Sequence, residues 1–131
     1  SSSIQLSADI QPDLSLWGNA QSLIRAFTNL IQNSLRYTLS TGQITVRGWH
    51  QENKLFITVE DTGVGIDAAH LDKIFDRFWR ADKARTQAAG GSGLGLSITQ
   101  AIVHNHGGTI TVESQVAQGS CFTIQLPVSS S

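Results

Sequence analysis

The sequence is poor in the residues that define several protein classes. It holds one cysteine, two prolines and no methionine. Cys121 alone cannot form an internal disulfide, and no Cys/His spacing typical of a metal site occurs. The longest apolar runs are far shorter than the ~18 residues that a membrane-spanning helix requires. Because methionine is absent, we expect an excised piece of a longer protein, with serines 1–3 and 129–131 as linker residues outside the fold.

Excess charge of one sign is also missing. The net charge is −1, from 9 basic and 10 acidic residues, which argues against a nucleic-acid-binding domain and against a polybasic membrane contact. With 40% apolar and 15% charged residues, the 131-residue chain fits one globular domain, which we expect to be monomeric and cytoplasmic. The cations are nevertheless uneven, since five of the nine lie between Lys73 and Arg85.

Hydrophobic periodicity predicts the element order β-α-β-β-α-loop-α-β-β. The expected strands are 4–10, 44–49, 55–60, 110–114 and 122–126, and the expected helices are 19–37, 67–79 and 94–105. In the first helix, one apolar stripe is expected from Leu23, Ile24, Phe27, Leu30, Ile31 and Leu35. Short turns between neighbouring strands predict an α+β fold, a two-layer α/β sandwich whose mixed, largely antiparallel sheet carries three helices on one face.

Two glycine-rich segments are candidates for nucleotide binding. Gly63 and Gly65, followed by Ala68, match the dinucleotide fingerprint, but that fold needs a parallel strand where residues 80–93 are predicted to be loop. A plain turn is the simpler alternative. The stretch from Gly90 to Gly95 precedes a helix and lacks a Gly-Lys-Ser/Thr sequence, so it suggests an anion site other than a Walker loop, or a flexible hinge.

Polar and cationic side chains complete the candidate set. Asn29 and Asn33 lie one helical turn apart, almost opposite the apolar stripe, and periodicity alone favours a solvated helix face. A carboxamide oxygen is also a suitable Mg²⁺ ligand. Arg80 and Arg85 border the glycine-rich loop, where they are either solvated charges or groups that neutralise phosphate.

Taken in order, these segments resemble the catalytic and ATP-binding domain of bacterial sensor histidine kinases, in the superfamily that includes gyrase B, Hsp90 and MutL. The resemblance covers 4–127 and implies the Bergerat-type ATP-binding fold. Five boxes carry it: Asn29 with Leu30–Thr38, Asp61-x-Gly63-x-Gly65, Phe75-Asp76-Arg77-Phe78, Gly91–Ile98, and Gly119-Ser120. Ser34 stands where the family usually has alanine, and Ser120 where it usually has threonine.

The resemblance implies roles for these residues. Asp61 would accept a hydrogen bond from the adenine amino group, and Asn33 would ligate Mg²⁺ with support from Asn29, directly or through water. The remaining nucleotide contacts that the resemblance implies are Arg36, Tyr37, Gly63, Gly65, Ile66, Arg80, Arg85, Gly91, Gly93, Leu94, Gly95, Leu96 and Ser120. Residues 80–93 would form a lid over the nucleotide.

The activity that the resemblance implies is phosphoryl transfer from Mg-ATP to a histidine on a separate phosphoacceptor domain, with a response regulator as downstream partner. Asn29 stands where the hydrolysing relatives typically have glutamate, so little ATP turnover is expected of this chain alone. The full protein would be a membrane-anchored sensor with this domain in the cytosol. An ATP-binding regulatory module and an anti-sigma-type serine kinase of the same superfamily are the alternatives.

Overall fold

The computed structural model describes residues 5–10, 20–38, 42–76 and 95–127. These residues form one five-stranded sheet in the order β1-β2-β3-β5-β4. The strands are β1 (Gln5–Ile10), β2 (Gln43–Gln51), β3 (Lys54–Asp61), β4 (Thr109–Gln115) and β5 (Gly119–Pro127). The helices are α1 (Ala20–Tyr37), the short 3-10 helix η1 (Ala68–His70) and α3 (Gly95–Asn105). Only β1 and β2 pair in parallel, so the predicted mixed, largely antiparallel sheet is confirmed.

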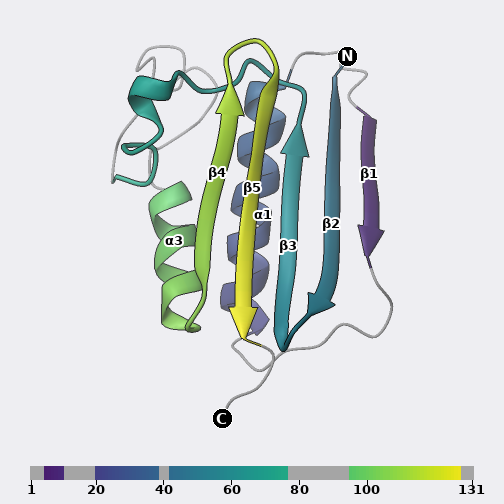
Figure 1. Cartoon of the computed structure of the whole chain (residues 1–131), viewed down its shortest axis with the longest axis vertical. Coiled ribbons are helices and arrows are strands. Elements are labelled where there is room, and N and C mark those ends of the chain that lie inside the picture. Colours follow the sequence, from purple (N-terminus) through teal and green to yellow (C-terminus); the bar gives the residue numbers. More distant parts are fainter. Residues whose placement is uncertain (1–4, 11–19, 39–41, 77–94, 128–131) are drawn as a thin grey trace.

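The molecule has two layers, with α1 and α3 lying against the same face of the sheet (Figure 1). The core between them is built from alternate strand residues, because successive side chains of a strand point to opposite faces. Its most deeply buried members come from α1, three strands and α3, and they are Leu30, Ile44, Val59, Val103, Phe122, Ile124 and Leu126. The predicted two-layer fold class is therefore confirmed.

The turns that set the strand register carry the expected backbone geometry. Glu52 and Asn53 both have positive φ, which gives the tight turn that matches the twist of the β2–β3 hairpin. Gly107 ends α3 with φ of +77°, and the Gly108 N–H donates to the Val103 carbonyl at 2.9 Å. A glycine with positive φ just after the last helical turn is a common way for a helix to end.

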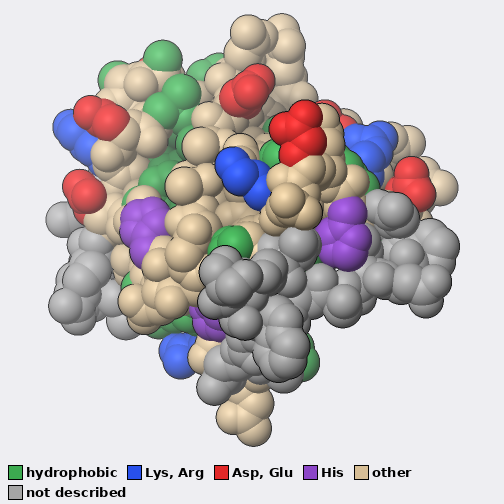
Figure 2. Space-filling view, turned by 60° about the horizontal axis from the view of Figure 1, so that its bottom comes forward, with side chains coloured by type: hydrophobic (Ala, Val, Ile, Leu, Met, Phe, Trp, Pro, Cys, Tyr) green, Lys and Arg blue, Asp and Glu red, His purple; other side chains and the backbone are tan. Residues whose placement is uncertain are grey.

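The outer face of the sheet carries its own, weaker contacts. Trp49 and Phe56 stack with ring centroids 5.5 Å apart, and Arg47 pairs with Glu60 at 3.3 Å. Because both charged side chains are about half exposed, this ion pair contributes little stability. Figure 2 brings forward the end of the molecule opposite to Asp61, the last residue of β3. There, acidic and basic side chains are interspersed among the coloured residues. No helix in the described segments is both long and apolar enough to cross a membrane.

The predicted helix over 67–79 is wrong for the part of it that the structure describes. Asp67 is the N-cap and accepts from the Ala69 N–H at 2.9 Å, but η1 ends at His70. The following turns use i→i+3 bonds, such as Asp76 N–H to the Lys73 carbonyl at 2.9 Å. A segment this short depends on tertiary packing, and here the packing favours successive turns that bury Ile74. The helix count of three therefore falls to two α-helices and one 3-10 turn in the described residues.

The inner face of α1 is also rotated from the predicted stripe. Ile24 and Leu35 are 63% and 43% exposed, whereas Ala26 and Ser34 have no exposed surface. The reason is that α1 contacts α3 as well as the sheet, and at Ala26 the helices are close enough for its carbonyl to accept from the Thr99 hydroxyl of α3 at 3.5 Å. A stripe drawn from large apolar residues alone misses these positions.

Candidate functional site

Several predicted motifs meet at one end of the sheet. In Figure 1 the upper end holds the tip of β3, the β4–β5 turn and η1. Three buried polar side chains gather at this end, and they are Ser34 of α1, Asp61 of β3 and Ser120 of β5. Asp61 pairs directly with Ser120 in the sheet register. Buried polar groups need partners, so this concentration marks the end of the sheet as a candidate site.

Asp61 is the central group of this site. Its side chain lies on the helix-facing side of β3, in the same alternation as Val59, and it is only 5% exposed. The backbone N–H groups of Gly63 and Ser120 donate to its Oδ1 at 2.9 and 3.3 Å. Both bonds end on the same oxygen, so Oδ2 is the atom left to accept from a ligand.

Burial sets the electrostatics of Asp61. Desolvation raises its pKa above the ordinary value, because a charged carboxylate is disfavoured away from water. The Gly63 N–H, the Ser34 hydroxyl and the Ser120 N–H lower the pKa, whereas the neighbouring Glu60 charge raises it. A carboxylate held in this way is poised to accept a hydrogen bond from a donor that enters the site.

The loop after β3 is fixed by close backbone contacts. Gly65 has φ of +76°, and a Cβ placed there would lie 2.1 Å from the carbonyl oxygen of Gln115. The Val64 carbonyl accepts from the Ala117 N–H at 2.8 Å, which ties the loop to the β4–β5 turn. The packing of the protein itself therefore requires glycine at position 65, with or without a bound ligand.

Ser114 is a site residue that the sequence did not reveal. Its Oγ accepts from the Ile66 N–H at 2.7 Å, donates to the Gly119 carbonyl at 2.8 Å and lies 2.9 Å from the Ser120 Oγ. One hydroxyl therefore connects the loop after β3 with the start of β5. No pattern in the sequence pointed to Ser114, and its pairing with Ser120 across the β4–β5 hairpin is seen only in the structure.

Asn29 links the two helices beside this site. Its Nδ2 donates to the Gly95 carbonyl at 3.3 Å, and the Thr99 hydroxyl donates to the same carbonyl at 2.8 Å. Asn33 lies one turn further along α1, and both asparagines are partly buried. The fully solvated helix face that periodicity alone favoured is therefore wrong. The N-terminus of α3 lies beside the predicted asparagine pair.

The remaining predicted residues divide into three groups. Gly63 is buried, whereas Ile66 and Leu96 are partly buried and pack against the core cluster. Arg36 and Tyr37 belong to the last turn of α1, and their side chains lie outside the described atoms. Outside the described residues altogether are Arg80, Arg85, Gly91, Gly93 and Leu94, together with the whole of the predicted lid, 80–93.

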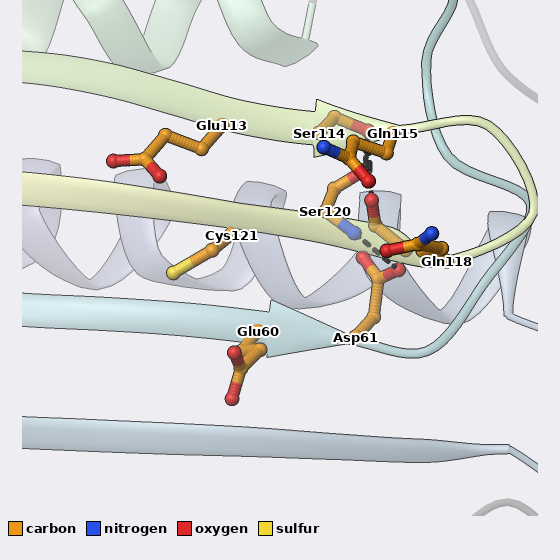
Figure 3. A pocket seen from close by; sticks show the side chains of 9 residues that line it. Glu60, Asp61, Glu113, Ser114, Gln115, Gln118, Ser120 and Cys121 are labelled. Atoms are coloured by element: carbon orange, nitrogen blue, oxygen red, sulfur yellow. Dashed lines mark hydrogen bonds between the residues drawn. The ribbon is translucent and has the colours of Figure 1, made fainter.

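A cleft of about 330 Å³ opens at the same end of the sheet. Glu60, Cys121 and Glu113 project side by side from three neighbouring strands, with Asp61 beside Ser120 at the strand ends (Figure 3). Burial raises the pKa of the Cys121 thiol and the Glu60 charge adds to the rise, so the thiol stays protonated at neutral pH. Glu60, Asp61 and Glu113 line this cleft, and carboxylates disfavour a bound anion.

Comparison with known proteins identifies the family. Residues 18–130 match the family described as histidine kinase-, DNA gyrase B-, and HSP90-like ATPase. The chain belongs to this family. Among its relatives, the sensor histidine kinase RppB of Synechocystis is 43% identical over 126 residues, which is 95% of this chain and 28% of RppB.

Solved structures of the family share the fold. The mycobacterial sensor histidine kinase MprB superposes with a TM-score of 0.83 at 27% identity, covering 95% of this chain and 82% of that one. The catalytic domain of the histidine kinase ThkA gives 0.83 at 26% identity, covering 96% of this chain and 80% of that one. The chain spans little more than a quarter of the length of RppB, so it corresponds to one part of such a protein.

Proposed function

We propose that this chain binds Mg-ATP and donates the γ-phosphoryl group to a histidine on a separate domain, as the catalytic part of a sensor histidine kinase. The buried Asp61 carboxylate, with Oδ1 fixed by two backbone N–H groups, is the observation that carries the proposal. A carboxylate only accepts hydrogen bonds, so it favours the 6-amino group of adenine over the 6-keto oxygen of guanine. Family membership and the sensor histidine kinase relatives support the same activity.

The asparagine pair fits a magnesium site. In the described parts of the chain, no group of three or more His, Cys, Asp or Glu side chains is placed to hold a metal ion. Mg²⁺ usually takes few protein ligands together with substrate phosphates, and a carboxamide oxygen of Asn33 suits this need. When bound, the ion would offset negative charge on the phosphates.

Phosphoryl transfer in this arrangement depends on positioning. The bond between the γ-phosphorus and its bridging oxygen breaks, a bond to the imidazole nitrogen forms, and ADP leaves. Asp61 would fix the base while the α3 N-terminus and Asn33 lie toward the phosphates, so that the γ-phosphoryl group points at the acceptor histidine. Residues 80–93, with Arg80 and Arg85, would close over the nucleotide as a lid.

Replacing Asn33 with alanine is expected to weaken ATP binding about tenfold when magnesium is present and much less when it is chelated. The reason is that the substitution removes a metal ligand but leaves the contact between Asp61 and the base. Calorimetry with ATP, in Mg²⁺ and in EDTA, measures both conditions. Gln32→Ala is the matched control, because Gln32 is the exposed neighbour on α1. Equal losses for Asn33→Ala with and without magnesium would contradict the assignment.

The phosphotransfer itself is tested by adding a histidine-bearing acceptor domain and γ-labelled ATP. The expected product is an acid-labile phosphohistidine on the acceptor, with little ATP turnover when this chain is alone. Acid-stable phosphoserine on a partner would instead support the serine kinase, and nucleotide binding without any transfer would support the regulatory module. We also propose that the full protein is anchored in a membrane and that its downstream partner is a response regulator.

A further inference from the structure

The hydroxyl of Ser114 has a complete set of hydrogen bonds. A serine hydroxyl can donate one hydrogen bond and accept two. The Ser114 Oγ lies 2.8 Å from the Gly119 carbonyl oxygen, which can only accept, so the single proton of the Ser114 hydroxyl is used there. The backbone N–H of Ile66 donates to the same Oγ at 2.7 Å. One further acceptor position remains on this oxygen.

Ser120 occupies that position. The two hydroxyl oxygens lie 2.9 Å apart, and this distance alone permits either of them to be the donor. Because the proton of Ser114 is directed at the Gly119 carbonyl, Ser120 must be the donor in this pair. The Ser120 hydroxyl therefore has no proton left for a bound molecule, and it can only accept a hydrogen bond from one.

Ser120 lies beside Asp61 at the end of the sheet. The two residues pair directly across β3 and β5, both are buried, and the Ser120 N–H donates to the Asp61 Oδ1 at 3.3 Å. Both line the cleft of about 330 Å³, where they lie at the strand ends (Figure 3). An ionised Asp61 only accepts hydrogen bonds, and the bond to Ser114 limits Ser120 to the same role. These two side chains therefore present acceptors and no donor to a ligand.

Two neighbouring acceptors favour a base that carries an amino group. The 6-amino group of adenine has two N–H hydrogens to donate, whereas a 6-keto purine presents an oxygen that needs a donor. A site built from groups that bond an N–H discriminates strongly against an analogue that lacks it. A freely rotating Ser120 hydroxyl would weaken this discrimination, because it could turn its proton toward a keto oxygen.

We propose that Ser114 is a positioning residue for base recognition: it takes the Ser120 proton, so that Ser120 and Asp61 together select a nucleotide with an amino group. The inference rests on the proposed function, since it assigns Asp61 to the base. Ser114 acts through Ser120, because its own hydroxyl is already saturated by protein partners.

The test compares the affinities for ADP and for inosine diphosphate, in which a 6-keto oxygen replaces the amino group. Calorimetry on the parent should show tighter binding of ADP. In Ser114→Ala the Ser120 hydroxyl loses its acceptor and can turn toward the keto oxygen, so we expect the ratio of the two affinities to shrink about three- to tenfold. Ser114→Thr keeps the hydroxyl and should keep the ratio. A purely structural role would weaken both nucleotides equally and leave the ratio unchanged.

Further variants connect the effect to Ser120. In Ser114→Ala combined with Ser120→Ala, the ratio should equal that of Ser120→Ala, since no hydroxyl is left to turn. Ser120→Ala alone should weaken binding of ADP but not of inosine diphosphate. This variant also serves if Ser114→Ala does not fold, because it leaves the bonds of Ser114 to Ile66 and Gly119 in place. Thr111→Ala, which removes an exposed hydroxyl from the opposite face of β4, is the matched control and should leave both affinities unchanged.

The outcomes separate the inference from the function on which it rests. If the parent prefers ADP but Ser114→Ala keeps the parental ratio, the role of Ser114 is overturned while the nucleotide site stands. Equal losses of both nucleotides in Ser120→Ala would also overturn it, because a pure acceptor cannot bond a keto oxygen. A parent that binds neither nucleotide would instead overturn the proposed function. In that case amide exchange of Ile66 without nucleotide, expected to be faster in Ser114→Ala, still decides whether the hydroxyl holds this loop.

Discussion

Replacing Asp61 with asparagine is expected to weaken ADP and ATP binding about 100-fold while making the unliganded protein more stable at neutral pH. The introduced amide can keep its oxygen on the Gly63 and Ser120 N–H groups, which now bind Oδ1 at 2.9 and 3.3 Å. Its NH₂ group would then occupy the place of Oδ2 and face the adenine amino group. Two donors cannot share a hydrogen bond, so the base contact is lost.

The stability effect follows from the direction of the pKa shift. Burial raises the folded-state pKa of Asp61 above 3.8, so the folded protein holds this proton more tightly than the unfolded chain does. The contribution of Asp61 is therefore most favourable below pH 3.8 and is lost as the pH rises through the folded-state pKa. At neutral pH the ionised carboxylate lowers stability, and a neutral amide removes that penalty. We expect Tm to rise by about 2–5 °C.

Calorimetry with ADP and thermal unfolding at pH 7 and pH 4 measure the two effects. Glu60→Gln is the matched control, since Glu60 is the adjacent carboxylate on the opposite face of β3 and is half exposed. It should leave ADP affinity within about twofold, because an exposed charge on the other face acts weakly. Nucleotide affinity in Asp61→Asn close to that of the parent would remove Asp61 from the base site. An unchanged Tm would mean that the free-energy cost of desolvating the Asp61 carboxylate is small.

The sequence predicted those elements whose apolar pattern extends over many residues or whose turns have distinctive chemistry. The α1 helix and the β2–β3 and β4–β5 hairpins were read correctly, because each has a regular apolar pattern or a turn residue with positive φ. The segment after Asp67 was read as a helix because its apolar spacing fits one, but spacing does not distinguish i→i+3 from i→i+4 bonding. Tertiary contacts, such as the edge-to-face packing of Phe75 on Phe122, decide that geometry.

Only part of the candidate site was predictable from the sequence. Asp61, Gly65 and Asn29 stood in recognisable motifs, and the structure places them at or beside one end of the sheet. Ser34 and Ser114 were missed as contributors because a serine has no periodic signature. Their importance depends on partners distant along the chain, such as Ile66 for Ser114, 48 positions away. Local patterns cannot show contacts of this range before the fold is known.

Gly119 couples the turn before β5 to the backbone of Asp61, and its substitution by alanine is expected to be severely destabilising. Its φ is +115°, a conformation that side-chain-bearing residues rarely adopt. A Cβ would also lie 2.0 Å from the Asp61 carbonyl oxygen and 2.9 Å from its carbonyl carbon. Both are backbone atoms of a central strand, so neither can move aside by a change of rotamer. We expect a loss of about 3 kcal/mol or more in the free energy of unfolding.

Urea unfolding of Gly119→Ala, with Gly95→Ala as control, tests this coupling. Gly95 is the first residue of α3, and a Cβ placed there would meet nothing within 4 Å, so its substitution should change stability by less than about 1 kcal/mol. If Gly119→Ala is folded at low temperature, its ADP affinity should still fall, because relief of the clash must move the Asp61 main chain or the adjoining turn. Equal urea midpoints for the two variants would show that the turn can yield without disturbing β3. The glycine would then serve the family's nucleotide site for some reason other than this close approach to Asp61.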